Sequence, residues 1–289
     1  MRKPQDRPSL VDILPGLFPI HVVDIGATPL YGGPPPYAGL LKSGFARVVG
    51  FEPDPEGLAE LNRQKGPHET YLPYVIADGQ AHQFKVCRTR DVSSLLEPNH
   101  ELLSYFHGFP HWCTVERRVP VATRRLDDIA KIENIDFLKI DIQGAELMVF
   151  EHAQKRLANC LVIQTEVEFL PMYEGQPLFS EVELFLRRHG FLIHKFDPLK
   201  SRAIQPMIVN NDIYAGFSQI FWADAVFVRD FTRLQVLSPE QLLKLALVMH
   251  DVYGSHDIVL RALMEYDRRS NDSKHAKRFM ESFKDRVSP

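Results

Sequence analysis

The sequence predicts an α/β fold, in which helices cover both faces of a doubly wound, mostly parallel sheet of seven strands, followed by a C-terminal helical extension. Two observations predict it. Short apolar runs alternate with helical segments along most of the 289 residues, and this alternation is typical of parallel sheets. The runs are apolar almost to their last residue, as expected for strands that are covered on both faces.

The seven apolar runs are the predicted strands, and we expect one of them to lie antiparallel at an edge of the sheet. They cover residues 20–25, 47–52, 71–77, 136–141, 161–166, 191–196 and 225–229. Three helices are predicted between them from capping and stop residues. These helices cover residues 54–66, 144–157 and 177–189.

The segment from residue 79 to residue 126 interrupts this alternation. It contains two extended runs, residues 82–87 and 118–123, on either side of a polar segment with prolines and histidines. An insertion of this length at the carboxyl end of a strand is more often functional than not. Its aromatic cluster, which includes Trp112, predicts either packing within the insertion or a lid or platform for a sugar ring.

Residues 238–289 form the predicted helical extension. Ser238 begins a capping box, and further helices are predicted at 256–266 and 273–285. Their apolar stripes must be buried, because short helices are marginal alone in water. We expect them to pack on the sheet domain, on each other, or on a protein partner or second copy of the chain. The basic charge from Arg268 onward is either solvated or a contact surface for an anionic partner.

Composition and charge narrow the class of protein. Hydrophobic residues make up 45% and charged residues 25% of the chain, and the net charge is −3. These values exclude disordered, collagen-like and coiled-coil chains, and they argue against binding nucleic acid through bulk charge. Three widely spaced cysteines predict a reducing compartment. No transmembrane run or signal peptide is evident, so we expect a soluble cytoplasmic protein with an N-terminal segment (1–19), a sheet domain (20–232) and the extension (238–289).

The first two strands each end in a carboxylate. Asp24 closes the first run, and Gly26 follows in a turn that lets backbone approach a ligand closely. The alternative is that Asp24 caps the next helix. Glu52 closes the second run, and its two oxygens could accept both hydroxyls of a ribose. Because only Gly26 fits the dinucleotide fingerprint, an oxidoreductase with a nicotinamide or flavin dinucleotide is disfavoured.

The fourth strand carries Lys139 and Asp141, which point to the same side because they lie two residues apart. Gly144 then opens a helix whose N-terminus favours anionic groups. The fifth strand adds Glu166 at the same height. These residues are either a structural ion-pair cluster or a site where neighbouring charges tune a proton acceptor.

In their order and spacing, these motifs resemble the FkbM family of S-adenosylmethionine-dependent methyltransferases, which have a Rossmann-like sheet. The matching segments are residues 23–27, 50–55, 77–79, 93–95, 125–128, 138–146, 165–166 and 171–175. The resemblance covers about residues 20–230, and it implies that S-adenosylmethionine is the cofactor.

The resemblance implies a role for each strand end in holding the cofactor. Asp24 and Gly26, with Ala27 beside them, would border the methionine portion. Asp141 would lie beside the sulfonium, and carboxylates at the strand ends suit that positive charge. The motifs at residues 50–55 and 77–79 would contact the adenosine portion.

Glu52, with Pro53, would bind the ribose hydroxyls, and Asp78 would bind the adenine amine. Two positions depart from the family pattern. Leu30 stands where the family usually has a second glycine. Gln143 stands where the family often has a glutamate that could act as a base or metal ligand.

The expected reaction is methyl transfer from S-adenosylmethionine to an oxygen, a hydroxyl of a sugar, glycan or secondary metabolite. The protein must align the acceptor with the methyl group and take the proton of the hydroxyl. The candidates for that proton are Asp141, Glu166, a neutral Lys139, and His107 or His111 of the insertion. The alternative function is a non-catalytic, methyltransferase-like scaffold or partner-binding protein.

We predict no metal site. His107 and His111, with Cys113 nearby, have only a superficial likeness to one, because helix-breaking residues lie between the two histidines. A divalent ion bound by Asp141 and Glu166 is not expected either. The predicted partner is a small-molecule or glycan acceptor, and no nucleic-acid partner is expected.

Overall fold

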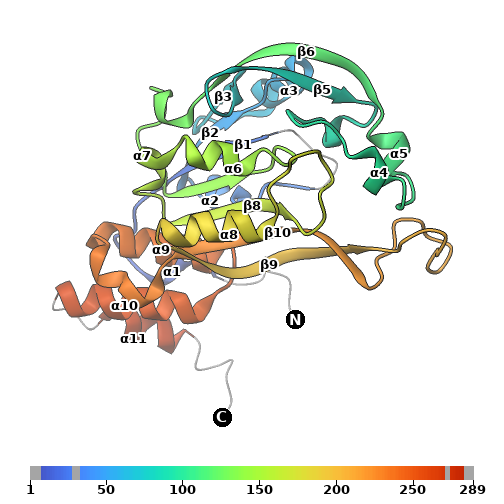
Figure 1. Ribbon diagram of the computed structural model, residues 1–289. Coiled ribbons are helices and arrows are strands. Elements are labelled where there is room, and N and C mark those ends of the chain that lie inside the picture. The colour runs from blue at the N-terminus through green and yellow to red at the C-terminus, as the bar shows by residue number, and fades with distance from the viewer. Residues whose placement is uncertain (1–7, 28–32, 271–273, 283–289) are drawn as a thin grey trace.

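The computed structural model describes residues 8–27, 33–270 and 274–282, and a sheet of seven strands lies at its centre (Figure 1). Its strands are β1 (Ile20–Ile25), β2 (Ala46–Phe51), β3 (Glu69–Leu72), β7 (Phe137–Ile140), β8 (Val162–Glu168), β9 (Phe191–Arg202) and β10 (Gln219–Arg229). Their order across the sheet is β3-β2-β1-β7-β8-β10-β9. The pairs from β3 to β8 are all parallel, which confirms the predicted mostly parallel sheet.

The antiparallel strand was expected at an edge of the sheet, and this predicted position is wrong. The antiparallel strand is β10, which lies inside the edge, between β8 and β9. It runs antiparallel to both neighbours, so the edge strand β9 has the same direction as β8. The reason is that β9 and β10 form a long hairpin that returns into the sheet. Apolar runs reveal only the inner part of that hairpin, so both strands are also longer than predicted.

The predicted strand at residues 71–77 is divided between two sheets. The main sheet keeps β3, whereas β4 (Val75–Ile76) pairs with β6 (Val115–Arg124). Pro73 lies at the division and has no N–H group for a strand ladder. The strand β6 also pairs antiparallel with β5 (Ala81–Cys87), which confirms the two strands predicted in the insertion. Together β4, β6 and β5 form a second, three-stranded sheet.

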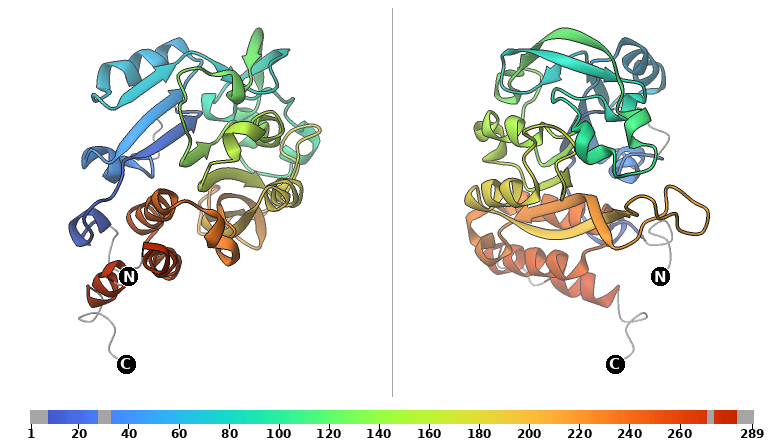
Figure 2. Two further views of the ribbon diagram at one scale, coloured as in Figure 1. Left: turned by 90° about the vertical axis from the view of Figure 1, so that its left-hand side faces the viewer. Right: turned by 45° about the vertical axis from the view of Figure 1, so that its right-hand side comes forward.

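Helices cover both faces of the main sheet (Figures 1 and 2). Alternate residues of each strand enter two different cores, as the pleat requires. Val22 and Phe137 pack with α1, α2, α9 and α10, whereas Val23 and Leu138 pack with α6, α7 and α8. The helices are α1 (Leu10–Ile13), α2 (Ala38–Lys42), α3 (Pro55–Gln64), α4 (His100–Leu103), α5 (Phe109–Trp112), α6 (Glu146–Glu151), α7 (Gln154–Leu157), α8 (Phe179–Arg188), α9 (Pro239–Asp251), α10 (His256–Ser270) and α11 (Lys274–Glu281).

One predicted helix, residues 144–157, is two helices in the structure, α6 and α7. The backbone N–H groups of Lys155 and Arg156 donate to the carboxylate of Asp127 at 3.2 and 2.9 Å. Asp127 therefore caps α7 as a separate helix, and a cap supplied from so far along the chain leaves no signal in the helix itself.

The C-terminal helices pack directly on the main sheet. Every residue of α9 from Leu242 to His250 is buried. The charged member of this run, Lys244, places Nζ 3.1 Å from Oδ2 of Asp136, the residue before β7. The ends of the predicted helix 273–285 fall partly outside the described residues. Within the described residues, no helix is both long enough and apolar enough to cross a membrane.

Candidate active site

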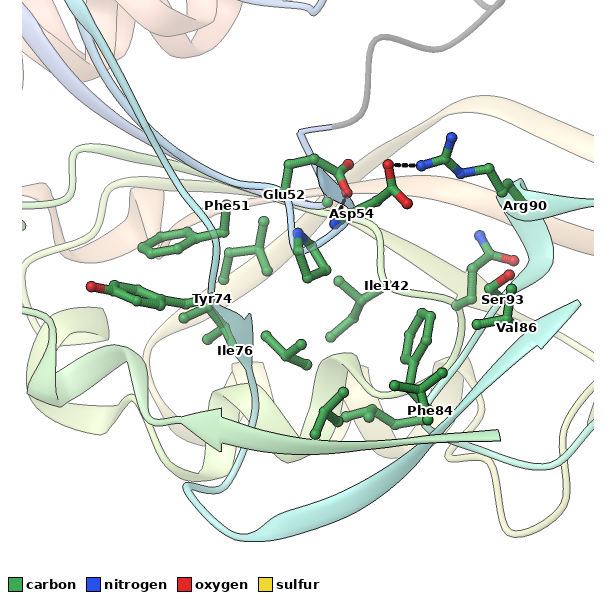
Figure 3. Close-up of a pocket in the computed structure, with 18 of the residues that line it drawn as sticks. Phe51, Glu52, Asp54, Tyr74, Ile76, Phe84, Val86, Arg90, Ser93 and Ile142 are labelled. Atoms are coloured by element: carbon green, nitrogen blue, oxygen red, sulfur yellow. Dashed lines mark hydrogen bonds and ion pairs between the residues drawn. The ribbon is translucent and has the colours of Figure 1, made fainter. Parts of the chain in front are cut away.

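A cavity of about 570 Å³ opens at the carboxyl ends of β1, β2 and β7, and its volume is typical of small-molecule sites. The main sheet forms one side, and the second sheet forms the opposite wall (Figure 3). Apolar side chains make up much of the wall: Phe51, Tyr74, Ile76, Phe84, Val86, Leu95, Val119 and Val121. The charged side chains that line it are Glu52, Asp54, Glu56, Arg90, Asp91, Arg117 and Asp141.

Gly26 brings the ends of β1 and β7 into contact at this cavity. It has a φ of +80°, a conformation that glycine adopts freely. A Cβ atom at this position would collide with the backbone oxygen of Asp141. The glycine that the sequence predicts is therefore required here by both space and backbone conformation. Leu30, the other position of interest in this loop, lies outside the described residues.

Glu52 lies at the end of β2, lines the cavity and is only 3% exposed. Its Oε1 accepts a hydrogen bond from the backbone N–H of Asp54 at 2.7 Å. Asp54 caps α3 by accepting from the N–H of Gly57 at 2.8 Å. The strand end and the helix start are thus fixed together, and Pro53 lines the cavity between them.

Arg90 was not predicted as a site residue. It lies in the 3₁₀ turn η2 (Arg90–Val92) and forms ion pairs with Asp54 and Glu56 at the start of α3 (Figure 3). This contact joins the insertion to the main sheet beside the cavity. The sequence does not predict this contact, because Arg90 and its partners lie on separate elements.

Asp24 lies in β1 and does not line the cavity. Tyr37 donates its hydroxyl to Asp24 Oδ2 at 2.6 Å, and Lys139 Nζ lies 3.3 Å from Oδ1. Lys139 also donates to the backbone oxygen of Gly26 at 3.2 Å. Burial alone would lower the pKa of Lys139, but the carboxylates of Asp24 and Asp141 outweigh it and raise the pKa. Neither Asp24, Lys139 nor Ala27 lines the cavity.

Asp141 lines the cavity just beyond β7, and Gln143 connects it to Glu166. Gln143 Nε2 donates to Asp141 Oδ1 at 2.9 Å and to Glu166 Oε2 at 2.6 Å. Burial, followed by the carboxylates of Asp141 and Glu168, raises the pKa of Glu166 well above its ordinary value. Glu166 lies outside the cavity lining, so Asp141 is the carboxyl group of the pair that faces the cavity.

Asp78 and His111, which are also predicted site residues, likewise lie outside the cavity lining. Asp78 Oδ1 accepts a hydrogen bond from the N–H of Gln80 at 2.9 Å, and it lies 2.8 Å from His82 Nε2 and 3.2 Å from Thr123 Oγ1. These contacts turn Asp78 toward the β5–β6 pair. His111 is exposed on α5, with Nδ1 2.9 Å from a guanidinium nitrogen of Arg88.

The aromatic cluster of the insertion packs into a small core that it shares with β10 and with residues after β8. Phe106 and Phe109 pack against Phe221 of β10, with ring centroids 4.5 and 5.0 Å apart. Trp112 packs on Phe109 and stacks on Tyr214 at 5.5 Å. Of the two alternatives, the structure therefore favours core packing of the inserted segment, against β10 and the segment after β8. Among the described residues, no group of three or more histidine, cysteine or acidic side chains could hold a metal ion.

Comparison with known proteins gives a family match and several weaker likenesses. Residues 24–193 match the family model described as the methyltransferase FkbM domain. The 2-O-methyltransferase NoeI of Sinorhizobium fredii (strain NBRC 101917 / NGR234) is 29% identical over 158 residues, which are 48% of this chain and 61% of that protein. The match therefore spans about three-fifths of the length of this relative.

Two solved methyltransferase structures show the weaker likenesses. Magnesium protoporphyrin IX methyltransferase (ChlM) from Synechocystis PCC 6803 with bound S-adenosylmethionine has a TM-score of 0.36 and 12% identity, over 76% of this chain and 74% of that one. The 23S rRNA methyltransferase ErmE has a TM-score of 0.35 and 10% identity, over 94% of each chain. The family match covers more than half of the chain, and the chain therefore belongs to the FkbM family of S-adenosylmethionine-dependent methyltransferases.

Proposed function

We propose that this chain is an O-methyltransferase that methylates a hydroxyl group of a sugar, a glycan or a secondary metabolite. The observation that carries the proposal is that Gly26, Glu52 and Asp141 line the same cavity. The relative named as a 2-O-methyltransferase supports oxygen as the atom that receives the methyl group.

The residues of the cavity fit S-adenosylmethionine, which supplies an electrophilic methyl group on a positively charged sulfur. Glu52 offers a buried carboxyl group suited to ribose hydroxyls. Gly26 leaves room for close approach, and the carboxylate of Asp141 favours a cation. Apolar side chains such as Ile76 and Phe84 suit the adenine ring, and we assign its binding to them because Asp78 is engaged elsewhere.

We propose that Asp141 takes the proton of the acceptor hydroxyl. Glu166 lies outside the cavity lining, and Lys139 is held in its charged form by Asp24. His111 is bound to Arg88, away from the cavity. Asp141 is the candidate that lines the cavity, and a carboxylate in reach of a hydroxyl can act as a general base.

The proposed function is tested by incubating the protein with methyl-labelled S-adenosylmethionine and a panel of hexose, deoxyhexose and N-acetylhexosamine glycosides. The expected result is labelled product in an amount equal to the S-adenosylhomocysteine formed. The label should survive alkaline hydrolysis, since a methyl ether is stable to base and a methyl ester is not. Cofactor binding without transfer to any acceptor would favour the scaffold alternative instead.

Replacing Glu52 with alanine is expected to weaken the binding of S-adenosylhomocysteine by roughly 1.5–3 kcal/mol, the scale of a hydrogen bond to a charged group. Isothermal titration calorimetry measures this directly. The matched control is Glu60→Ala on α3, because Glu60 pairs with Arg63 at the helix surface. Unchanged affinity in a folded Glu52→Ala protein would remove Glu52 from the proposed ribose site.

Methyl transfer is expected to continue in the presence of EDTA. The space between Asp141 and Glu166 is taken by the Gln143 amide nitrogen, which lies 2.9 and 2.6 Å from their oxygens. The carboxyl groups that could best share a cation are therefore already bridged. Turnover is measured before and after chelation, and a loss that Mg²⁺ or Zn²⁺ restores would contradict this prediction.

A further inference from the structure

We propose that Gln143 is a positioning residue, whose side-chain amide holds the Asp141 carboxylate at the cavity in the way that a bridging cation would. The proposal rests on the proposed function, in which Asp141 accepts the proton. An amide nitrogen has two protons to donate. Gln143 donates both to carboxyl groups, one to Asp141 beyond β7 and one to Glu166 on β8.

The amide is held from its other side as well. Tyr173 is fully buried, and its hydroxyl lies 3.1 Å from Gln143 Oε1 and 3.0 Å from the backbone oxygen of Val92, so its one proton is shared between these two acceptors. Ser94 Oγ donates to the backbone oxygen of Gln143 at 2.7 Å. A flipped amide would place its oxygen against two carboxyl groups, so the network favours one orientation. Both the side chain and the backbone of Gln143 are therefore fixed.

The backbone conformation indicates that this position is determined by its surroundings. Gln143 has a φ of +61°, a backbone conformation that residues other than glycine rarely adopt. Among the described residues, the other non-glycine positions with positive φ are Asn210 and Asn211, and asparagine adopts this conformation more readily. The next residue, Gly144, also has a positive φ of +99°, and a Cβ atom there would approach Gln176 Nε2 to 2.7 Å. Such strain persists where packing enforces it.

The charges around Gln143 explain why a neutral donor suits this place. Asp141 and Glu166 approach the same nitrogen atom, and Glu146 and Glu168 add carboxyl groups nearby. A glutamate at position 143 would add a third carboxyl group against the first two, and a proton or a cation would be needed between them. Oxygen ligands of this kind suit Mg²⁺ and Mn²⁺. The amide instead joins the two groups without adding charge.

The deciding experiment needs no methyl acceptor and uses the full chain. Gln143→Glu is expected to bind one Mn²⁺ ion per chain, measured by the loss of the free-ion signal in electron paramagnetic resonance. Wild type and the control Gln154→Glu, which changes an exposed residue of α7, should bind none. Adding Asp141→Asn to Gln143→Glu should remove the ion. A folded Gln143→Glu protein that binds no more Mn²⁺ than wild type overturns the proposal.

Turnover on a hydroxyl acceptor gives the second readout. Gln143→Ala is expected to lower kcat by about 10–100-fold, the usual scale for a residue that orients a reacting group, while the KM for S-adenosylmethionine changes little. Tyr173→Phe should give a smaller fall in kcat of the same kind, and it decides the matter if Gln143→Glu does not fold. Full turnover in both, or a matching loss of cofactor affinity, overturns the positioning role. If wild type methylates no hydroxyl, the proposed function fails, and Mn²⁺ binding still decides the role of Gln143.

Discussion

Replacing Asp141 with asparagine is expected to lower kcat by about 10²–10⁴-fold, the usual contribution of a general base. Asparagine has nearly the same shape as aspartate, and its oxygen still accepts from Gln143, so the local structure should persist. It cannot take the proton of a hydroxyl group. The measurement is kcat with a hydroxyl acceptor, together with the affinity for S-adenosylhomocysteine and the melting temperature.

The matched control is Asp128→Asn. Asp128 is exposed and pairs with Arg125, whose Nε is 2.8 Å from it, so its replacement should leave turnover at the wild-type level. If Asp141→Asn keeps wild-type turnover, another group takes the proton, and the role assigned to Asp141 is wrong. If the Asp141→Asn protein loses affinity for the cofactor as well as turnover, the Asp141 carboxylate acts mainly by stabilising the positive charge of the sulfonium.

Ending the chain at Leu237 is expected to abolish folding. This change removes α9, whose residues Leu242, Leu245 and Val248 are fully buried in the core on one face of the sheet. A single buried Leu→Ala change costs about 2–5 kcal/mol, and whole domains are stable by only about 5–15 kcal/mol. The loss of several such side chains therefore exceeds the stability available. Soluble expression and circular dichroism measure the outcome.

The shorter truncation, which removes residues 270–289, is the comparison. It should leave a folded protein that binds S-adenosylhomocysteine, because α9 and most of α10 remain. Its melting temperature should fall, since Phe279 of α11 is 1% exposed and packs against His250 and His256. A soluble, monomeric chain with unchanged melting after the cut at Leu237 would show instead that the extension is a separable module.

The parts of the site that the sequence predicts are those set by one short segment. Glu52 and Asp141 each follow an apolar strand, and the end of such a run also marks the edge where ligands bind. Gly26 is predicted for the same reason, because the turn after β1 is visible within a few residues. The structure places all three at the cavity.

The remaining features depend on contacts between distant segments. Asp24 lies within β1, one residue before its end, and contacts Tyr37 and Lys139 instead of lining the cavity. From the sequence alone, Gln143 is noticed only as a position that lacks the carboxylate often found in the family. Two of its partners, Glu166 and Tyr173, are 23 and 30 residues away. The direction of β10 was missed for a similar reason, since it is fixed by its pairing with β8 and β9.

The second sheet has a consequence for how relatives of this protein could diverge. Its chain leaves the main sheet after β3 and comes back to its own beginning, because Val75 pairs with Thr123 and Ile76 with Arg124. A segment whose two ends meet can be lengthened, shortened or exchanged without rethreading the rest of the fold. Evolution could therefore replace this wall of the cavity as a unit and change which molecules the cavity accepts, while the ends of β1, β2 and β7 are inherited unaltered.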